Sequence, residues 1–430
     1  MSAAGEKQAG QRPEVRSQRS DLRPPTSEIR PQTSDLWLAA ELAALDEAGL
    51  RRRVSSRRGP QGATIALAGR GTRYSGSLVN FGSNDYLGLA ADPRLAAAAI
   101  AAITAEGVGS GASPLITGQS DTHARLEQRL AEFERAEAAL VFPSGFAANL
   151  AAVTALAGPG DVVFGDAKNH ASIWDGCRLS RADVRVYPHG DWQRLDALLA
   201  RASTYRRRLI VSDSLFSMDG DLAPLAELAA VARRHEAMLL IDEAHATGVF
   251  GEQGRGAAEY LNVEEGVTAR VGTLSKALGC SGGFVSGSRE LIDYIINRGR
   301  SYIYSTAAPA AISAAALAAL DIVQAEPQRR RELLRQAAAL RQRLAERGWA
   351  LGPSTSQIIP IVVGRPQRAL ELSQRLRARG LFVPAIRPPT VPEGEACLRV
   401  SLTWGHSEEQ IAALVEGLGE AGTGIPNALR

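Results

Sequence analysis

Cysteine is scarce in this sequence, with only Cys177, Cys280 and Cys397 among 430 residues. An odd number at wide spacing suits neither a disulfide framework nor the paired ligands of a zinc site, so we expect no bound metal and a reducing, cytoplasmic setting. No stretch reaches the roughly 18 uninterrupted apolar residues of a membrane span, and the N-terminus lacks the apolar core of a secretory signal. The most apolar stretch, residues 307–323, is interpreted as a buried helix.

An excess of one charge is also missing, because 49 basic residues face 46 acidic ones and the net charge is +3. So small an excess predicts no nucleic-acid partner. The GxxxxGK[ST] loop of P-loop nucleotide-binding proteins does not occur either. With 45% hydrophobic and 22% charged residues the composition is that of a globular protein, and the length suffices for a large domain and a smaller one.

The chain is expected to contain four regions. Residues 1–36 are poor in apolar residues and hold a degenerate seven-residue repeat (RSQRSDL, RPPTSEI, RPQTSDL) whose prolines exclude a coiled coil, so we predict a disordered, low-complexity tail. Residues 37–88 are expected to form a helix and short strands. Residues 89–309 would form a large domain, and residues 310–430 a smaller C-terminal α/β domain.

Apolar runs and helical stretches alternate through most of the large domain. This alternation predicts the α/β class, with a mostly parallel sheet covered by helices. In such sheets ligands bind at the carboxyl ends of the strands, where several polar motifs fall. The predicted strands are residues 139–142, 162–164, 184–187, 209–211, 238–241 and 271–273, followed by 358–363 and 398–403 in the smaller domain. The predicted helices include residues 124–137, 146–157, 223–234 and 408–419.

The strand at residues 238–241 ends in Asp242, and His245 follows three residues later. A carboxylate in such an apolar setting needs a cationic partner or several hydrogen bonds, and a protonated pyridinium nitrogen would supply the cation. Keeping that nitrogen protonated is what makes pyridoxal 5′-phosphate (PLP) an electron sink. The alternatives are a helix N-cap or the metal-binding carboxylate of an ATPase-like strand, and the missing P-loop weakens the second.

Lys276 lies just past the strand at residues 271–273, among small and hydroxyl-bearing residues such as Thr273 and Ser275. A lysine attacks an aldehyde only when it is neutral, and burial lowers the pKa of a lysine from a reference near ~10.4. A surface loop would explain Lys276 by itself. Together with Asp242 and His245, a Schiff base between Lys276 and the PLP aldehyde is the better interpretation.

Three further segments give weaker signals. Pro143–Gly145 joins a strand to a helix, where free N–H groups and the helix dipole bind phosphate, although a plain turn explains it too. His170 could stack on the cofactor ring, though a lone histidine is more often structural. Ser217 could bond the region of the cofactor's phenolic oxygen, while a simple turn at Asp219 and Gly220 explains that segment almost as well.

In their order along the chain, these segments resemble the α-oxoamine synthases, a family of PLP-dependent enzymes of fold type I. The resemblance covers residues 38–420 and is carried by NFGSNDYLGL (80–89), FPSGFAANLA (142–151), SLFSMDGDLAPL (214–225), DEAHATGVFGEQGRG (242–256) and GTLSKALG (272–279). It implies the transferase fold type I, with a large PLP-binding domain, and an acyltransferase activity. IYSTA (303–307) resembles a segment that reaches the phosphate of the neighbouring subunit, so a homodimer with shared active sites is implied.

The resemblance also implies roles for individual residues. Lys276 would hold PLP as a Schiff base, Asp242 would pair with the pyridinium nitrogen, His245 would lie near the cofactor's O3′, and His170 would stack on the ring; these four are the implied catalytic residues. The other implied cofactor contacts are Gly145, Phe146, Ser217 and Thr273. The implied substrate contacts are Arg51, His170, Thr390 and Arg399, of which Arg399 would hold the amino-acid carboxylate.

Within the family, IRPPTVP (386–392) looks like the branch that condenses L-alanine with a pimeloyl thioester, on CoA or on a carrier protein, in biotin biosynthesis. Pro114 is a departure, because many members have Arg or His at this position of a loop that borders the substrate. The alternatives are a sibling such as glycine C-acetyltransferase, an aminotransferase of the same fold, and a PLP-binding protein without turnover.

Overall fold

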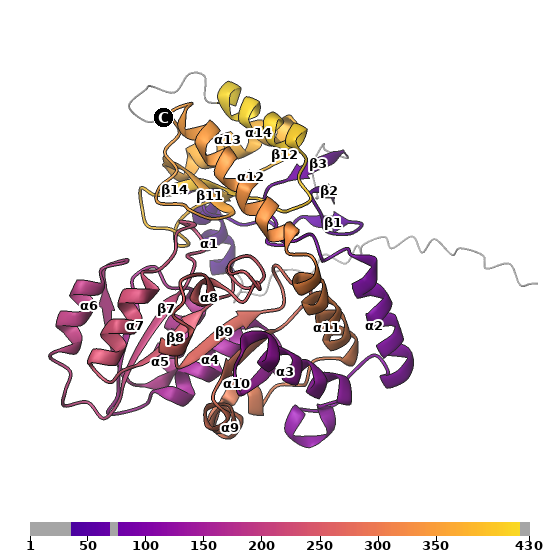
Figure 1. Cartoon of the computed structure of the whole chain (residues 1–430). Coiled ribbons are helices and arrows are strands. Elements are labelled where there is room, and N and C mark those ends of the chain that lie inside the picture. The colour runs from indigo at the N-terminus through magenta and orange to yellow at the C-terminus, as the bar shows by residue number, and fades with distance from the viewer. Residues whose placement is uncertain (1–35, 69–75, 422–430) are drawn as a thin grey trace, which may run out of the picture. The chain divides into compact units, whose positions relative to one another are not determined.

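The structure of this protein is a computed structural model that describes residues 36–68 and 76–421 (Figure 1). The chain divides into two compact units, the first ending at Arg51 and the second beginning at Arg52. In the first unit, α1 (Leu36–Glu47) is the helix that was predicted from Trp37 onward. The predicted tail, residues 1–36, lies outside the described residues apart from Leu36.

A seven-stranded sheet forms the centre of the second unit, in the order β4-β10-β9-β8-β7-β5-β6. The last five strands of this order are parallel, while β10 runs antiparallel to both β9 and β4. The bounds are β4 Ala138–Phe142, β5 Val162–Asp166, β6 Asp183–Tyr187, β7 Arg208–Asp213, β8 Met238–Asp242, β9 Ala269–Thr273 and β10 Gly283–Gly287. The predicted α/β class with a mostly parallel sheet is confirmed.

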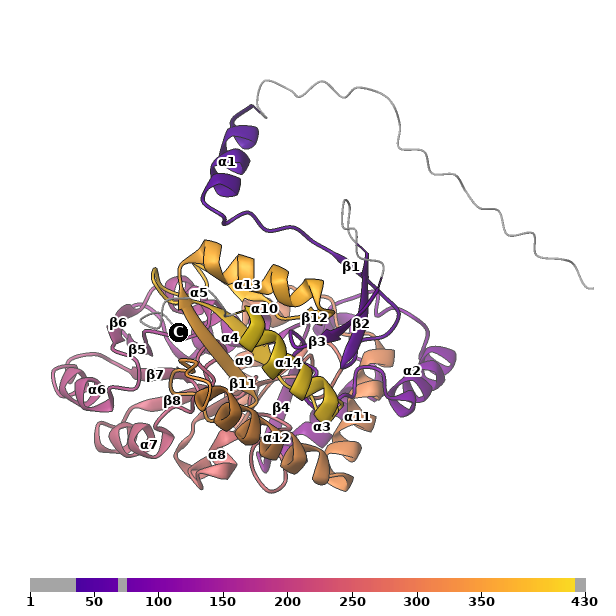
Figure 2. The same ribbon diagram turned by 90° about the horizontal axis from the view of Figure 1, so that it is seen from above.

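Helices cover both faces of this sheet (Figure 1, Figure 2). Alternate strand residues enter two separate cores, with Ile210 and Leu239 in one and Val211 and Leu240 in the other. α4, α5 and α9 pack in the second core, and α3, α6, α7 and α11 pack in the first. The bounds are α2 Pro93–Glu106, α3 Asp121–Glu134, α4 Gly145–Leu156, α5 Ala171–Ser180, α6 Trp192–Leu199, α7 Leu225–Arg234, α8 Ala257–Tyr260, α9 Arg289–Arg298, α10 Arg300–Ile303 and α11 Ala310–Ala325, with a π-helical turn, η2, at Pro114–Gly118 and a 3₁₀ turn, η3, at Glu264–Gly266.

The most apolar stretch of the sequence forms α11, whose Leu320 and Val323 are buried as predicted. Within residues 36–68 and 76–421, no single helix is long and apolar enough to cross a membrane. α11 and the helix that follows it, α12 (Gln328–Ala345), reach that length and hydropathy only together, as a pair bent by 71°.

Two smaller sheets complete the second unit. One has the order β1-β2-β3-β12, and β12 pairs in parallel with β3, so that Leu381 lies opposite Val79. The other has the antiparallel order β11-β14-β13. The bounds are β1 Ser56–Arg58, β2 Thr64–Ala68, β3 Ser77–Asn80, β11 Ile358–Gly364, β12 Leu381–Phe382, β13 Ala385–Ile386, β14 Ala396–Ser401, α13 Pro366–Ala378 and α14 Glu408–Ala421. Strands from the beginning and from the end of this unit thus share one sheet, and the division at residues 88 and 309 stays a prediction.

Candidate active site

A cavity of about 210 Å³ lies at the carboxyl ends of the parallel strands. Asp213 ends β7, Asp242 ends β8, and Lys276 follows β9 by three residues. Eight of the predicted site residues line this one cavity: Gly145, Phe146, His170, Ser217, Asp242, His245, Thr273 and Lys276. The structure therefore brings together residues that are spread over about 130 positions of the sequence.

Lys276 is buried among these side chains, and its Nζ lies 2.9 Å from Nε2 of His245. Burial lowers the pKa of Lys276 to about 8, against the opposing charges of Asp242 and Asp213. Burial, and then the charge of Lys276, also hold the pKa of His245 well below its usual range. His245 is therefore neutral at physiological pH, and Lys276 is poised to lose its proton only slightly above it.

Asp242 is held by two donors, the side-chain amide of Asn149 at 2.6 Å and the backbone N–H of Ala244 at 2.8 Å. These bonds fix the position of the Asp242 carboxylate, which lines the cavity. Asp213 lies directly opposite Asp242 in the β7–β8 register and accepts a hydrogen bond from the backbone N–H of His170 at 2.8 Å. Burial, reinforced by the charge of Asp242, raises the pKa of Asp213 well above its usual range. Asp213 is therefore the member of the pair that accommodates a proton.

His170 caps the N-terminus of α5 at the edge of the cavity. Its Nδ1 lies 2.7 Å from Oγ of Ser172, and its ring meets the ring of Phe146 edge-on, with the centroids 6.5 Å apart. Burial lowers the pKa of His170, with the charges of Asp242 and Lys276 acting in opposite directions. The imidazole is thus neutral, and its Nδ1 is engaged by Ser172.

The cavity also offers a place for a phosphate. α4 begins at Gly145, Ser144 caps it by accepting from the backbone N–H of Ala147 at 3.1 Å, and the hydroxyls of Thr273 and Ser275 lie 2.8 Å apart across the cavity wall. First-turn N–H groups and hydroxyls are the usual partners of a phosphate. With the Asp242 carboxylate and the buried Lys276 amine also in the cavity, the residues present fit PLP: a phosphate site, a partner for a ring N–H and an amine for an aldehyde.

Gly145 was predicted to contact the cofactor, at a turn where free N–H groups bind phosphate. A Cβ at Gly145 would be only in ordinary contact with Thr273, at 3.5 Å. The tighter position is Gly283 of β10, where a Cβ would lie 2.4 Å from the backbone nitrogen of Gly145. Position 283, beneath the start of α4, is therefore the one with no room for a side chain. Sequence reasoning missed Gly283.

Arg399 lies outside the cavity lining but is connected to it. Its Nε donates to the backbone carbonyl of Ser217 at 2.6 Å, and Nη1 donates to Oδ1 of Asn84 at 3.1 Å. Nη2 is buried and, within the part of the chain that the structure describes, has no hydrogen-bond partner. A buried guanidinium with one nitrogen left over suits an incoming carboxylate.

Two further predicted substrate residues, Arg51 and Thr390, are not among the residues that line the cavity. Thr390 is exposed and accepts a hydrogen bond from Arg52 at 3.0 Å, not from Arg51. Arg51 belongs to the first unit, where its guanidinium pairs with Asp46 at 2.5 Å. The assignment of Arg51 to the substrate stays a prediction, and Arg52 is the arginine that the structure connects to Thr390.

Other residues of the site escaped sequence reasoning. Tyr86 is fully buried, and its hydroxyl lies 2.6 Å from Nδ1 of His245. It therefore holds the imidazole whose Nε2 contacts Lys276. Asp213 carried the same signal as Asp242, an acid at the end of an apolar strand, and could have been found by the same argument. Tyr86 and Asn149 carried no such signal, because they reach the site only through tertiary packing.

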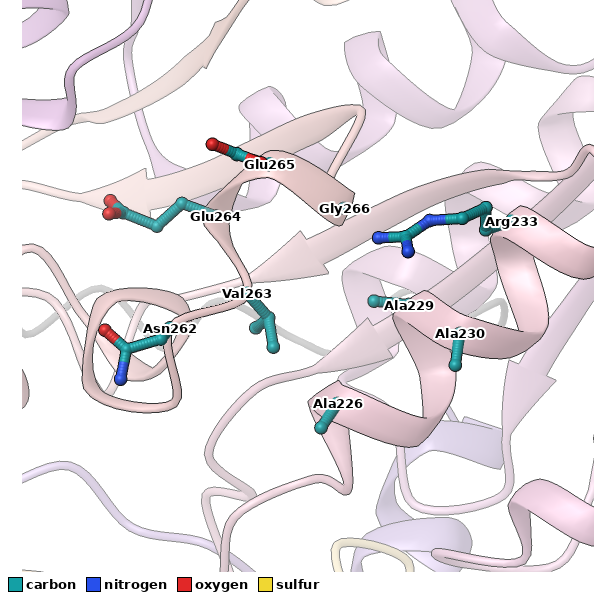
Figure 3. Close-up of a pocket in the computed structure, with 9 residues that line it drawn as sticks. All are labelled: Ala226, Ala229, Ala230, Arg233, Asn262, Val263, Glu264, Glu265 and Gly266. Carbon is teal, nitrogen blue, oxygen red and sulfur yellow. The ribbon is translucent and has the colours of Figure 1, made fainter.

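A second cavity, of about 480 Å³, lies toward the amino ends of the strands (Figure 3). Its lining segment, residues 262–266, precedes β9, and Arg233 belongs to the end of α7, just before β8. Arg233 points into the space between α7 and that segment (Figure 3). Glu264 is paired with Arg255. None of its described polar side chains is buried without a partner, so this cavity offers no chemistry comparable with the first.

Comparison with known proteins identifies the family of this chain. Residues 77–418 match the family model described as aminotransferase class I and II. An 8-amino-7-oxononanoate synthase of Anaeromyxobacter dehalogenans is 48% identical over 392 residues, which cover 91% of this chain and 97% of that protein. Further relatives at 42–47% identity carry the same name. The structure of serine palmitoyltransferase from Sphingomonas wittichii matches with a TM-score of 0.84 and 33% identity, covering 91% of this chain and 97% of that one.

A second solved structure, described as SPT with PLP as internal aldimine, has a TM-score of 0.84 and 32% identity, and covers 90% of this chain and 97% of that one. The fold and the site together define a PLP-dependent enzyme of fold type I. Within that class, the chain belongs to the α-oxoamine synthase family, as its motifs predicted, and PLP is its cofactor.

Proposed function

We propose that this protein catalyses the decarboxylative condensation of L-alanine with a pimeloyl thioester to give 8-amino-7-oxononanoate, a step of biotin biosynthesis. The reaction class rests on the buried Lys276, whose pKa is lowered to about 8, in a cavity that also holds Asp242 and the start of α4. The choice of substrates rests on the relatives named 8-amino-7-oxononanoate synthase, at 42–48% identity over about nine-tenths of the chain.

The proposed roles follow from the surroundings of each residue. When bound, PLP supplies an aldehyde to which amines attach and a pyridinium ring that accepts the electron pair of a carbanion. Asp242, held by Asn149 and Ala244, keeps the ring nitrogen protonated. Lys276 holds the cofactor between turnovers, and its neutral amine removes the Cα proton of alanine once the amino acid has displaced it.

The remaining residues position the reactants. Arg399 binds the alanine carboxylate through Nη2, which has no hydrogen-bond partner among the described residues. This contact fixes the orientation of the Cα–H bond toward Lys276. His170 covers one side of the cavity, and its neutral ring donates a hydrogen bond to the enolate oxygen that develops after condensation. Ser217, Thr273, Gly145 and Phe146 hold the cofactor, and Thr390 contacts the acyl substrate.

We also propose a homodimer in which residues 303–307 reach the partner's cofactor site, and a cytoplasmic location. Tyr304 and Thr306 of this segment are exposed in the single chain, as such a role requires. The thioester donor is pimeloyl-CoA or a pimeloyl carrier protein, because the chemistry at the thioester carbon is the same for both.

The experiment is a product assay with purified holoenzyme, L-alanine and pimeloyl-CoA, in which 8-amino-7-oxononanoate and CO₂ are measured by mass spectrometry. Product from alanine, with little from glycine or L-serine, is the expected result. Turnover with glycine but not alanine would assign the protein to a sibling activity. A parallel assay with the pimeloyl carrier protein identifies the donor.

Lys276→Ala is the matched variant in that assay, and we expect it to lower turnover by at least about 1,000-fold, because both attachment and proton transfer are lost. Lysine occurs only at positions 7, 168 and 276 of the sequence. Borohydride reduction of the wild-type holoenzyme should therefore place the cofactor on a single peptide containing Lys276. Label on Lys168, or substantial turnover by Lys276→Ala, would contradict the assignment.

A further inference from the structure

The segment that carries Ser217 is a tight hairpin over residues 215–222. Leu215 pairs with Leu222, the backbone N–H of Phe216 donates to the carbonyl of Asp221 at 3.0 Å, and Gly220 turns the chain with a φ of 72°. Ser217 lines the cofactor cavity, and its carbonyl accepts from Arg399. The position of this hairpin therefore determines two parts of the site, the cavity wall and the arginine proposed for the carboxylate.

His189 joins this hairpin to the rest of the site. It follows β6, and its Nε2 lies 3.0 Å from a carboxylate oxygen of Asp221, on the hairpin. Its Nδ1 lies 3.0 Å from Asp166, which ends β5. The ring also packs edge-on against Phe216, with a centroid distance of 4.3 Å. The His189 side chain thus contacts the hairpin in two ways, through an ion pair with Asp221 and through an edge-on ring contact with Phe216.

The other partner of His189, Asp166, organises the loop that leads to His170. Its carboxylate accepts from the backbone N–H groups of Lys168 and Gly190, at 2.9 and 2.8 Å. Asn169, in the same loop, bonds the carbonyl of Val211 and the N–H of Asp213, and His170 itself donates to Asp213. The loop is thereby fixed to the end of β7.

A single imidazolium between two carboxylates is a favourable arrangement in this partly buried place. Burial by itself would lower the pKa of His189, but the hydrogen bonds to Asp166 and Asp221 outweigh it and raise that pKa to about 10. His189 is therefore charged at neutral pH, and both ion pairs are present. Lys168 adds a second, more exposed link to the hairpin through Asp219, at 2.7 Å.

We propose that His189 is a positioning residue that holds the 215–222 hairpin against the loop carrying His170, and so sets the affinity of the site for both PLP and the amino acid. The inference rests on the proposed function, because it assumes that the cavity takes PLP and that Arg399 takes a carboxylate. His189 touches neither ligand in this assignment, since it acts through Asp221 and Phe216.

The test uses full-length protein and compares His189→Gln, Asp221→Asn, the double variant and His235→Gln. His235 is the matched control, because it forms a similar partly buried pair with Asp196, at 2.7 Å between α6 and the end of α7. The dissociation constant of PLP is measured by titrating the apoenzyme and following cofactor absorbance. The dissociation constant of L-alanine is measured from the change in that absorbance without any acyl donor, and thermal unfolding of each apoenzyme is recorded.

We expect His189→Gln and Asp221→Asn each to raise both dissociation constants by between about 5- and 100-fold, because coupled contacts in one network have effects of this size. In the double variant, each dissociation constant should exceed that of the weaker-binding single variant by no more than about twofold, because both substitutions break the same contact. In turnover, the KM for alanine should rise more than kcat falls. His235→Gln should change neither constant.

The proposal is overturned if His189→Gln lowers the unfolding temperature while both dissociation constants stay within about twofold of wild type, or if His235→Gln weakens binding equally. If His189→Gln does not fold, Asp221→Asn decides by the same criteria, because it leaves the contact between His189 and Asp166 in place. Both constants are measured without the thioester. A wild-type protein that binds PLP and alanine but makes no product would therefore contradict the proposed function and leave this inference standing.

Discussion

At the scale of single residues, the surroundings of Lys276 lower the pKa of its amine and so favour the neutral, reactive form. Lys276 is buried, and the histidine in contact with its Nζ is kept neutral by burial and by the charge of Lys276 itself. Two carboxylates oppose this effect, but Asp213 carries a raised pKa and Asp242 is already bonded to Asn149 and Ala244. The balance leaves the pKa of Lys276 near 8.

Cofactor capture should therefore depend on pH with a midpoint near 8. The neutral amine of Lys276 attacks the aldehyde, so the rate of PLP attachment to apoenzyme should rise about tenfold per pH unit below the pKa and level off above it. Stopped-flow absorbance over pH 6.5 to 10 measures this rate. A rate that does not change across the range would contradict the prediction.

The same pKa shift has a consequence for the stability of the apoenzyme. The pKa of Lys276 is about 8 in the folded chain and 10.5 for an ordinary lysine, so the unfolded chain binds more protons between these values. The penalty of burying the charged amine is fully present below pH 8 and disappears as the pH rises toward 10.5. This group should therefore raise the free energy of unfolding of the apoenzyme as the pH rises from 8 to 10.5, which urea unfolding at several pH values measures.

Sequence reasoning found the site residues whose signal is local. Asp242, His245 and Lys276 sit at the ends of apolar strands in a chain that alternates strands and helices, and strand ends meet at one edge of a parallel sheet. Tyr86 comes from a segment outside this pattern, and only packing brings its hydroxyl to His245. Gly283 was missed because the close approach of its backbone to Gly145 exists only in the folded sheet.

At the scale of elements, the start of α4 rests on β10 without room for a side chain between them. A Cβ at Gly283 would lie 2.4 Å from the backbone nitrogen of Gly145, the first residue of the helix. β10 is fixed on both sides by antiparallel pairing with β4 and β9, so it cannot move away. Any added atom must displace the first turn of α4, which is the proposed phosphate site.

Gly283→Ala should consequently lower the free energy of unfolding by about 1–3 kcal/mol, the usual cost of overpacking, and weaken PLP binding roughly tenfold. Urea unfolding and PLP titration of the apoenzyme measure the two effects. Gly109→Ala is the control, because a Cβ there has nothing within 4 Å and the backbone needs no positive φ. Equal behaviour of the two variants would disprove the steric argument.

The strands were predictable where they were long and apolar, and less so where they were short. Four of the predicted strands of the central sheet, residues 139–142, 162–164, 209–211 and 238–241, are almost entirely buried, so they stand out as continuous apolar runs. Residues 184–187 lie on the edge strand β6, which is mostly exposed. β10 has only Phe284 and Val285 between small residues. β12 and β13 have two residues each, and only their pairing with β3 and β14 identifies them as strands.

At the scale of the whole molecule, the single chain leaves large apolar side chains uncovered close to the proposed active site. Ile116 of η2 is 74% exposed and Tyr304, just after α10, is 72% exposed. η2 and α10 are in contact, and Phe146, which lines the cofactor cavity, is also exposed. Apolar groups gathered in this way are typical of a surface that another chain covers.

Ile116→Asp should weaken the proposed homodimer by roughly tenfold or more, because it would bury an unpaired charge in the interface. Sedimentation velocity across a range of protein concentrations measures the monomer–dimer equilibrium. Val186→Asp is the matched control, since Val186 is 55% exposed on β6, at the far edge of the central sheet. Loss of the dimer with Val186→Asp alone would move the interface to that edge.

The pairing of β12 with β3 also sets the order in which the site can be completed during synthesis on the ribosome. Every strand of the central sheet has been made once residue 287 has emerged, and Asp242, His170 and Lys276 come with them. β3 must wait for β12, about 300 residues later, which takes roughly 15–60 seconds at common elongation rates. Arg399 arrives later still. A nascent chain therefore acquires the groups proposed to hold the cofactor well before it acquires the arginine proposed to hold the amino acid.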